Sequence, residues 1–137
     1  MISRTLICLS IMLVAAPASP QQPDTPVVVQ GQPGTIVIYR LGSVLGAAVA
    51  CPVRWKGEDV TELGRSRFTE WQVEPGRYIL ENRNASVEVS VVAGETRYVR
   101  CQIKSGFLAG RADLQIVDGS EFLDKRGSLQ LTEIQPE

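Results

Sequence analysis

The sequence predicts an all-β fold, an antiparallel β-sandwich of about seven to eight short strands, with a small barrel as the alternative. From residue 34 onward, short runs of apolar or alternating residues are separated by turn residues about every 8–12 positions. β-branched and aromatic residues fill many of these runs, as is typical of strands. No long run after residue 18 has the 3.6-residue period of an amphipathic helix. The chain has 137 residues, so one folded domain is expected.

The expected strands follow from residue type and alternation. Residues 35–40 are rich in β-branched side chains, and in residues 50–56 Cys51, Val53 and Trp55 alternate with Arg54 and Lys56. Further strands are expected at residues 67–73, 77–81, 87–91, 96–103 and 112–117. Residues 120–126 could form a helical turn, and residues 128–132 could form a last strand.

Turn residues mark the ends of these strands. Lys56-Gly57-Glu58-Asp59 follows the second strand, and Asn82–Ala85 and Ala93–Glu95 mark later turns. Glu74-Pro75-Gly76 places Pro and Gly at the two central positions that suit a type II turn. This turn predicts a hairpin between residues 67–73 and 77–81.

The N-terminus is expected to be a cleaved signal peptide, residues 1–18. Arg4 precedes an uncharged apolar run, and Ala16-Pro17-Ala18 has small residues where a signal peptidase cuts. The run is too short to cross a bilayer as a helix, and Cys8 lies inside it, too early to carry a lipid. The mature chain is therefore expected to be periplasmic or secreted, with no transmembrane span and no lipid anchor. A Pro/Gln-rich linker at residues 19–33, a β-sandwich domain at 34–134 and a tail at 135–137 complete the expected organisation.

Several short elements follow one another in a specific order: a first strand ending in Tyr39-Arg40, the segments at residues 53–57, 73–78 and 92–100, and Leu114-Gln-Ile-Val-Asp118. This order resembles a bacterial exported family known as domain of unknown function 2846. The resemblance covers roughly residues 34–134. It implies a β-sandwich of the cell envelope, similar to transthyretin-like modules. Many members carry a lipidation motif that this sequence lacks, and the family implies no activity.

Cys51 and Cys101 are the two cysteines that remain after removal of the signal peptide. Each lies on the apolar face of its expected strand. In an oxidising compartment the pair favours a disulfide, with two buried thiols or one reactive thiol as the alternatives.

Three other groups of residues are candidates for binding. Trp71 and Tyr78 could contact a sugar or could belong to the core. Two apolar loops flanked by glycine are candidate interaction loops, through Val44, Leu45, Phe107 and Leu108. They could instead cap the sandwich. Finally, Arg65, Arg67, Arg97 and Arg100 could form an anion-binding patch or could pair with Glu70, Glu81 and Glu88.

Composition excludes several classes of function. The chain has no histidine, so it cannot build a Ser-His-Asp triad or a histidine-ligated zinc site. Its net charge of −1 does not suit a nucleic-acid partner. We therefore expect no catalytic residues, metal or cofactor. The expected function is protein interaction or envelope assembly with an unknown envelope component, and the alternative is binding of glycan or peptidoglycan fragments through exposed aromatics.

Overall fold

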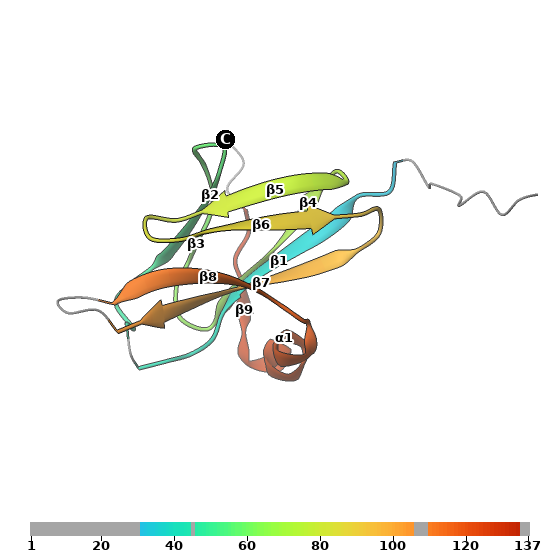
Figure 1. Ribbon diagram of the computed structural model, residues 1–137. Helices are drawn as coiled ribbons and strands as arrows, with labels where there is room; N and C mark the ends of the chain where they lie inside the picture. The colour runs from blue at the N-terminus through green and yellow to red at the C-terminus, as the bar shows by residue number, and fades with distance from the viewer. Residues whose placement is uncertain (1–30, 45, 106–109, 135–137) are drawn as a thin grey trace, which may run out of the picture.

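A computed structural model describes residues 31–44, 46–105 and 110–134. The strands form two layers, so the predicted β-sandwich is confirmed (Figure 1). One sheet has five strands in the order β8-β7-β1-β4-β9, and the other has four in the order β3-β2-β5-β6. The strands are β1 (Gly34–Arg40), β2 (Cys51–Trp55), β3 (Glu58–Leu63), β4 (Arg67–Val73), β5 (Gly76–Glu81), β6 (Ser86–Val91), β7 (Thr96–Lys104), β8 (Arg111–Val117) and β9 (Gln130–Leu131). Between β8 and β9 lie helix α1 (Ser120–Lys125) and a 3₁₀ turn, Arg126–Ser128.

The main core lies between the two sheets. It is built by the inward-facing residues that the alternation predicts, including Val53 and Cys51 on β2 and Val99 and Cys101 on β7. Its buried residues are Ile36, Ile38, Cys51, Val53, Val60, Leu63, Val73, Tyr78, Leu80, Val89, Val91, Val99, Cys101, Ala112 and Leu114. Burial of this set is the main source of stability, because each large apolar side chain contributes about 1.5–3 kcal/mol.

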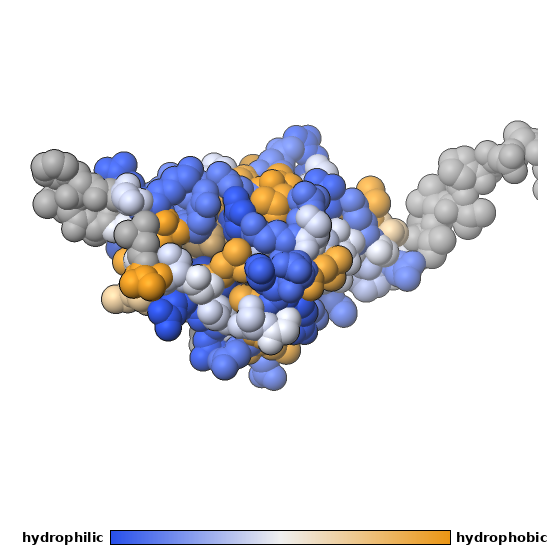
Figure 2. Space-filling view, turned by 90° about the horizontal axis from the view of Figure 1, so that it is seen from below, coloured by the Kyte–Doolittle hydropathy of each residue, from blue (hydrophilic) through white to orange (hydrophobic). Residues whose placement is uncertain are grey.

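Strand β1 is buried on both faces. Ile36 and Ile38 face the other sheet, whereas Val37 and Tyr39 face outward into a second cluster with Phe68, Phe122 and Leu129. Helix α1 covers this outer cluster, below the five-stranded sheet in Figure 1. Seen from that side, the coloured hydrophobic residues form small separate spots in a largely hydrophilic surface (Figure 2). The helix thus hides an apolar face that the sheet would otherwise expose.

A polar link fixes helix α1 to the sheet. The buried Tyr39 hydroxyl donates a hydrogen bond to Glu121 Oε1 at 2.7 Å, and Arg100 donates to Glu121 Oε2 at 2.7 Å. Burial alone would raise the pKa of Glu121, but the hydrogen bonds from Tyr39 and Arg100 outweigh it and lower that pKa. The carboxylate therefore stays ionised at neutral pH and holds the first turn of the helix in place.

Two expectations about the turn after β4 are corrected. Strands β4 and β5 do not form a hairpin, because β4 pairs with β1 and β5 pairs with β2 and β6. The Glu74-Pro75 turn instead carries the chain from one sheet to the other. Gly76 is the first residue of β5 and lacks the positive φ that a type II turn requires.

Strand β3 is absent from the expected strands, and the sheets are not purely antiparallel. Lys56 and Gly57 both have positive φ, so they form a two-residue turn that returns the chain directly into β3. The pairs β1–β7 and β4–β9 are parallel. Because β1 and β7 are far apart in sequence, alternation within each strand carried no information about this pairing.

A disulfide joins Cys51 on β2 to Cys101 on β7, as the sequence predicted. Their Cα atoms lie 6.6 Å apart, and both residues are almost fully buried. The bond crosses between the two sheets. It therefore fixes their spacing at the end of the sandwich where β1 ends and β2 begins.

We expect replacement of both cysteines, Cys51→Ala with Cys101→Ala, to lower the free energy of unfolding. The bond closes a loop with a sequence separation of 50. The expected loss is about 4 kcal/mol from the chain entropy that this loop removes from the unfolded state. Urea unfolding of the oxidised protein and of the double variant measures it. The protein with its original sequence is denatured without reduction for a thiol titration. Two titratable thiols from Cys51 and Cys101 would contradict the disulfide.

Two neighbouring residues on α1, one buried and one exposed, test the role of the outer cluster. Phe122 is buried against the rings of Tyr39, Phe68 and Tyr98, whereas its neighbour Leu123 is 65% exposed. We expect Phe122→Ala to cost about 3–5 kcal/mol and Leu123→Ala to change stability by about 0.5 kcal/mol or less. Thermal or urea unfolding compares them, and equal losses would show that α1 does not seal this face.

Candidate binding site at the disulfide end

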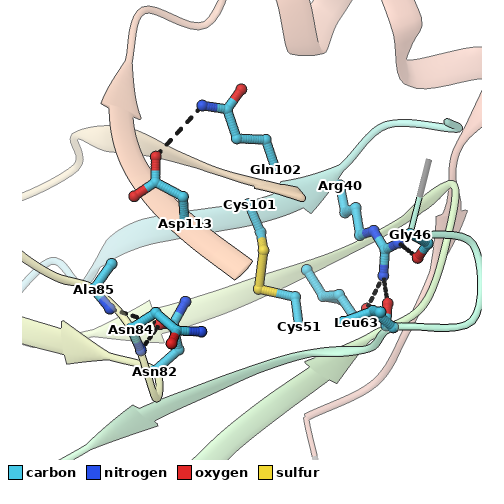
Figure 3. Close-up of a disulfide and its surroundings, with 11 residues drawn as sticks. Arg40, Gly46, Cys51, Leu63, Asn82, Asn84, Ala85, Cys101, Gln102 and Asp113 are labelled. Carbon is cyan, nitrogen blue, oxygen red and sulfur yellow. Dashed lines mark hydrogen bonds between the residues drawn. A yellow bond between two sulfur atoms is a disulfide. The ribbon is translucent and has the colours of Figure 1, made fainter. Parts of the chain in front are cut away.

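A buried arginine holds the loop between β1 and β2 in place. Arg40 is 2% exposed and lies at the end of β1. Its guanidinium donates hydrogen bonds to the backbone oxygens of Gly46 at 2.6 Å, of Leu63 at 3.2 Å, and of Val49. Figure 3 shows Arg40 on one side of the disulfide, reaching toward Gly46 and Leu63.

Arg40 is an unusual buried charge. Among the residues that the structure describes, no carboxylate lies within ion-pair distance of it. Burial lowers the pKa of Arg40, and repulsion from Arg65 lowers it further. Backbone carbonyl dipoles therefore replace an acidic partner, and the arginine fixes the loop through its hydrogen bonds to Gly46 and Val49.

The two glycine-flanked segments singled out in the sequence meet at Ile103. A Cβ built on Gly46 or on Gly110 would lie 2.4 Å from Ile103 Cγ2, so only glycine allows either backbone to approach so closely. Val44, on the first loop, is 89% exposed and does not cap the core. The other three candidate loop residues, Leu45, Phe107 and Leu108, lie outside the described residues.

A groove of about 780 Å³ lies at this end of the sandwich. Val49, Ala50 and Pro52 line it from the segment entering β2, and the turn after β5 contributes polar side chains. The start of β8 contributes to the lining as well. The described residues that line the groove are Val49, Ala50, Pro52, Glu62, Asn82, Arg83, Asn84, Gly110, Arg111 and Ala112. Each sheet thus contributes to the groove, and its volume lies in the range of small-ligand and peptide sites.

The turn after β5 is fixed by Asn82. Its Oδ1 accepts hydrogen bonds from the backbone N–H groups of Asn84 and Ala85, both at 2.8 Å (Figure 3). These bonds identify Oδ1 as the end of the amide that faces the turn, so the other end is the Nδ2 donor. That nitrogen is buried and has no hydrogen-bond partner among the described residues. Asn82, which lines the groove, therefore carries one unsatisfied donor.

A second groove, of about 460 Å³, adjoins the first and shares Pro52, Glu62, Asn82 and Arg83 with it. Thr61 and Thr132 line this second groove, and each has a buried hydroxyl without a hydrogen-bond partner. Three of the five unsatisfied buried side-chain atoms among the described residues therefore belong to residues that line this second groove. Buried polar atoms are normally paired, so this concentration is a departure from the rest of the fold.

The aromatic candidates lie toward the opposite end. Trp55, Trp71 and Tyr78 form a triangle with ring centroids 5.4–5.5 Å apart. Tyr78 is only 8% exposed, and its hydroxyl donates to the backbone oxygen of Glu74 at 2.6 Å. Trp55 and Trp71 are partly buried against the core. The three rings thus close the sandwich at this end and leave no open stacking face on Tyr78.

The arginine patch considered from the sequence is divided among different contacts. Arg97 pairs with Glu95 at 3.2 Å and Arg100 with Glu121 at 2.7 Å. The arginines on the groove, Arg83 and Arg111, were not singled out by the sequence. Their only sequence signal is their position at the ends of strands, next to turn residues.

Comparison with known proteins places the chain in a family. The family described as protein of unknown function (DUF2846) matches residues 30–113, more than half of the chain, so the protein belongs to it. A search of curated proteins and a search of solved structures gave no match. The family match ends within β8, so helix α1 and β9 lie beyond it.

Two further properties bear on the site. Within the described residues, no three His, Cys, Asp or Glu side chains are grouped so that they could hold a metal ion. Within the same ranges, no helix is long and apolar enough to cross a membrane.

We expect Arg40→Met to release the loop and to destabilise the fold. The variant would leave three backbone oxygens without their charged donor, at a cost of about 3 kcal/mol. Hydrogen exchange should also accelerate at the Val49 amide, which donates to Gly46 O at 2.9 Å. Arg40→Lys should not restore stability, because an ammonium lacks the planar fork of donors.

Arg77→Met is the matched control for Arg40. Arg77 is exposed and pairs with Glu88 on the outer face of the four-stranded sheet. Its loss should change the free energy of unfolding by about 1 kcal/mol or less. Equal urea midpoints for the two methionine variants would show that Arg40 does not anchor the loop.

Proposed function

We propose that this protein is an exported, non-enzymatic β-sandwich module of the bacterial envelope, and that it binds a partner protein with its disulfide end. The observation that carries the proposal is an exposed apolar residue on a firmly held loop. Val44 is 89% exposed, while Arg40 and Ile103 fix the loop that presents it. A pre-organised loop loses little entropy on binding, which favours a contact surface.

Three features support the remaining parts of the proposal. The N-terminal segment has the pattern of a signal peptide, and the disulfide fits an oxidising compartment. The sequence offers no histidine, and both cysteines of the folded domain are bonded to each other. The common nucleophile–base pairs therefore cannot be assembled from them. Binding of a glycan through Trp71 and Tyr78 is less favoured, because these rings pack on each other.

Site-directed photocrosslinking in producing cells tests this proposal. A benzophenone amino acid replaces Val44 in one variant and Val92 in another. Val92 is also an exposed apolar residue, at 63%, but it lies next to the start of β1 at the other end of the sandwich. We expect a discrete crosslinked product from position 44 only, with an envelope protein identified in it by mass spectrometry.

Direct binding of that protein then completes the test. Val44→Asp should weaken binding by about tenfold or more, since a charge in an apolar contact is costly, without changing the thermal midpoint. No discrete product at position 44, or identical products at positions 44 and 92, would contradict the proposal.

A further inference from the structure

We propose that the 780 Å³ groove binds a free C-terminal carboxylate of a peptide. This inference rests on the proposed function, because it names the part of the partner protein that the disulfide end would receive. Charge, an unsatisfied donor, wall chemistry and rigidity support it independently.

The charges of the groove favour an anion. Arg83 lies in the turn after β5 and Arg111 begins β8, so two cationic residues from different sheets line the groove. Within the described residues, neither is within ion-pair distance of an acidic group. Glu62 is the acidic residue of the described lining. Two guanidinium groups without acidic partners are suited to a carboxylate, whose two oxygens match the guanidinium donors.

The unsatisfied donor belongs to a residue that lines the same groove. Asn82 Nδ2 is buried without a partner among the described residues, and its own turn prevents the amide from flipping. A buried donor left unpaired costs about 1–3 kcal/mol, and a ligand oxygen would recover part of that cost if binding moves the turn enough to reach it. A peptide supplies such acceptors from its carboxylate and from its last backbone carbonyls.

The apolar wall favours a peptide over a sugar. Val49, Pro52 and Ala112 offer small aliphatic surfaces, and the described lining includes no aromatic ring on which a sugar could stack. The wall is also rigid. Pro52 follows the bonded Cys51, Val49 accepts a hydrogen bond from Arg40, and Ala112 pairs with Ile103 in the β7–β8 ladder. Such a wall suits the small side chains at a peptide end.

A titration of the folded, ¹⁵N-labelled protein tests the inference. The probes are acetyl-Ala-Ala-Val-Ala with a free carboxylate, the same peptide as its C-terminal amide, and glucuronate. We expect the free acid to shift the amide resonances of Arg83, Asn84 and Arg111. The C-terminal amide should bind about tenfold more weakly, the effect of losing one charge-assisted contact.

Two variants and a matched control locate the site. Arg83→Gln and Arg111→Gln should each weaken binding of the free acid by about tenfold. Arg77→Gln, which removes an exposed arginine from a different face, should leave it unchanged. Thermal midpoints of all three should match the unmodified protein, because these side chains are exposed.

Several outcomes would overturn the inference. They are no binding of the free acid, equal binding of acid and amide, retention of affinity in both arginine variants, or tighter binding of glucuronate through the same arginines. Failure here is distinct from failure of the proposed function. A crosslink at position 44 without peptide binding supports the partner surface and contradicts only the carboxylate site. Peptide binding without that crosslink supports the carboxylate site and contradicts the partner surface.

Discussion

The bond between Cys51 and Cys101 is the constraint on which the disulfide end of the sandwich depends. It connects the first residue of β2 to the middle of β7, and these strands belong to different sheets. One wall of the larger groove follows directly from Cys51, and the other is carried by β8, which pairs with β7. Without the bond, only non-covalent packing would set the distance between the two walls. At the other end, the packed rings of Trp55, Trp71 and Tyr78 serve the same purpose by contact alone.

Strand β1 is the central strand of the fold, because it contacts both apolar clusters and the loop. Its inner face supplies Ile36 and Ile38 to the main core, its outer face supplies Val37 and Tyr39 to the helix, and its last residue, Arg40, anchors the loop. The family match includes all of β1 but ends before α1. Phe122 and Leu129, which cover the outer face of β1, therefore lie outside the matched part, although Tyr39 contacts Glu121 directly.

Alternation within strands predicted the faces, and together with an oxidising compartment it favoured the disulfide. Cys51 and Val53 were assigned to one face of β2, and Val99 and Cys101 to one face of β7, and all four are core residues. Strand partners were harder to predict. A Pro-Gly turn within a sheet and one that crosses between sheets have the same local residues, so the turn at Glu74-Pro75 was misread as a hairpin. Strand β3 was missed because its charged start, Glu58-Asp59, resembles the continuation of a turn.

The candidate site was only partly predictable for a different physical reason. Glycine-flanked apolar loops are visible in a sequence, and Val44 is exposed on one of them. The role of Arg40 was not, because its partners are backbone oxygens that every residue carries. Arg83 and Arg111 are 28 positions apart in the sequence and come to one groove only through the pairing of sheets. Such sites are defined by topology rather than by a local pattern.

The parallel pairing of β1 with β7 has a consequence for the order in which the molecule assembles. β1 is the first strand of the chain, yet one of its edges and the sulfur partner of Cys51 arrive only when β7 has emerged. The four-stranded sheet can pair within residues 51–91, but the five-stranded sheet and the disulfide between the two sheets must wait for β7. Contacts between residues so far apart in the sequence make folding slow. The two layers can therefore be joined covalently only late, when most of the chain is available.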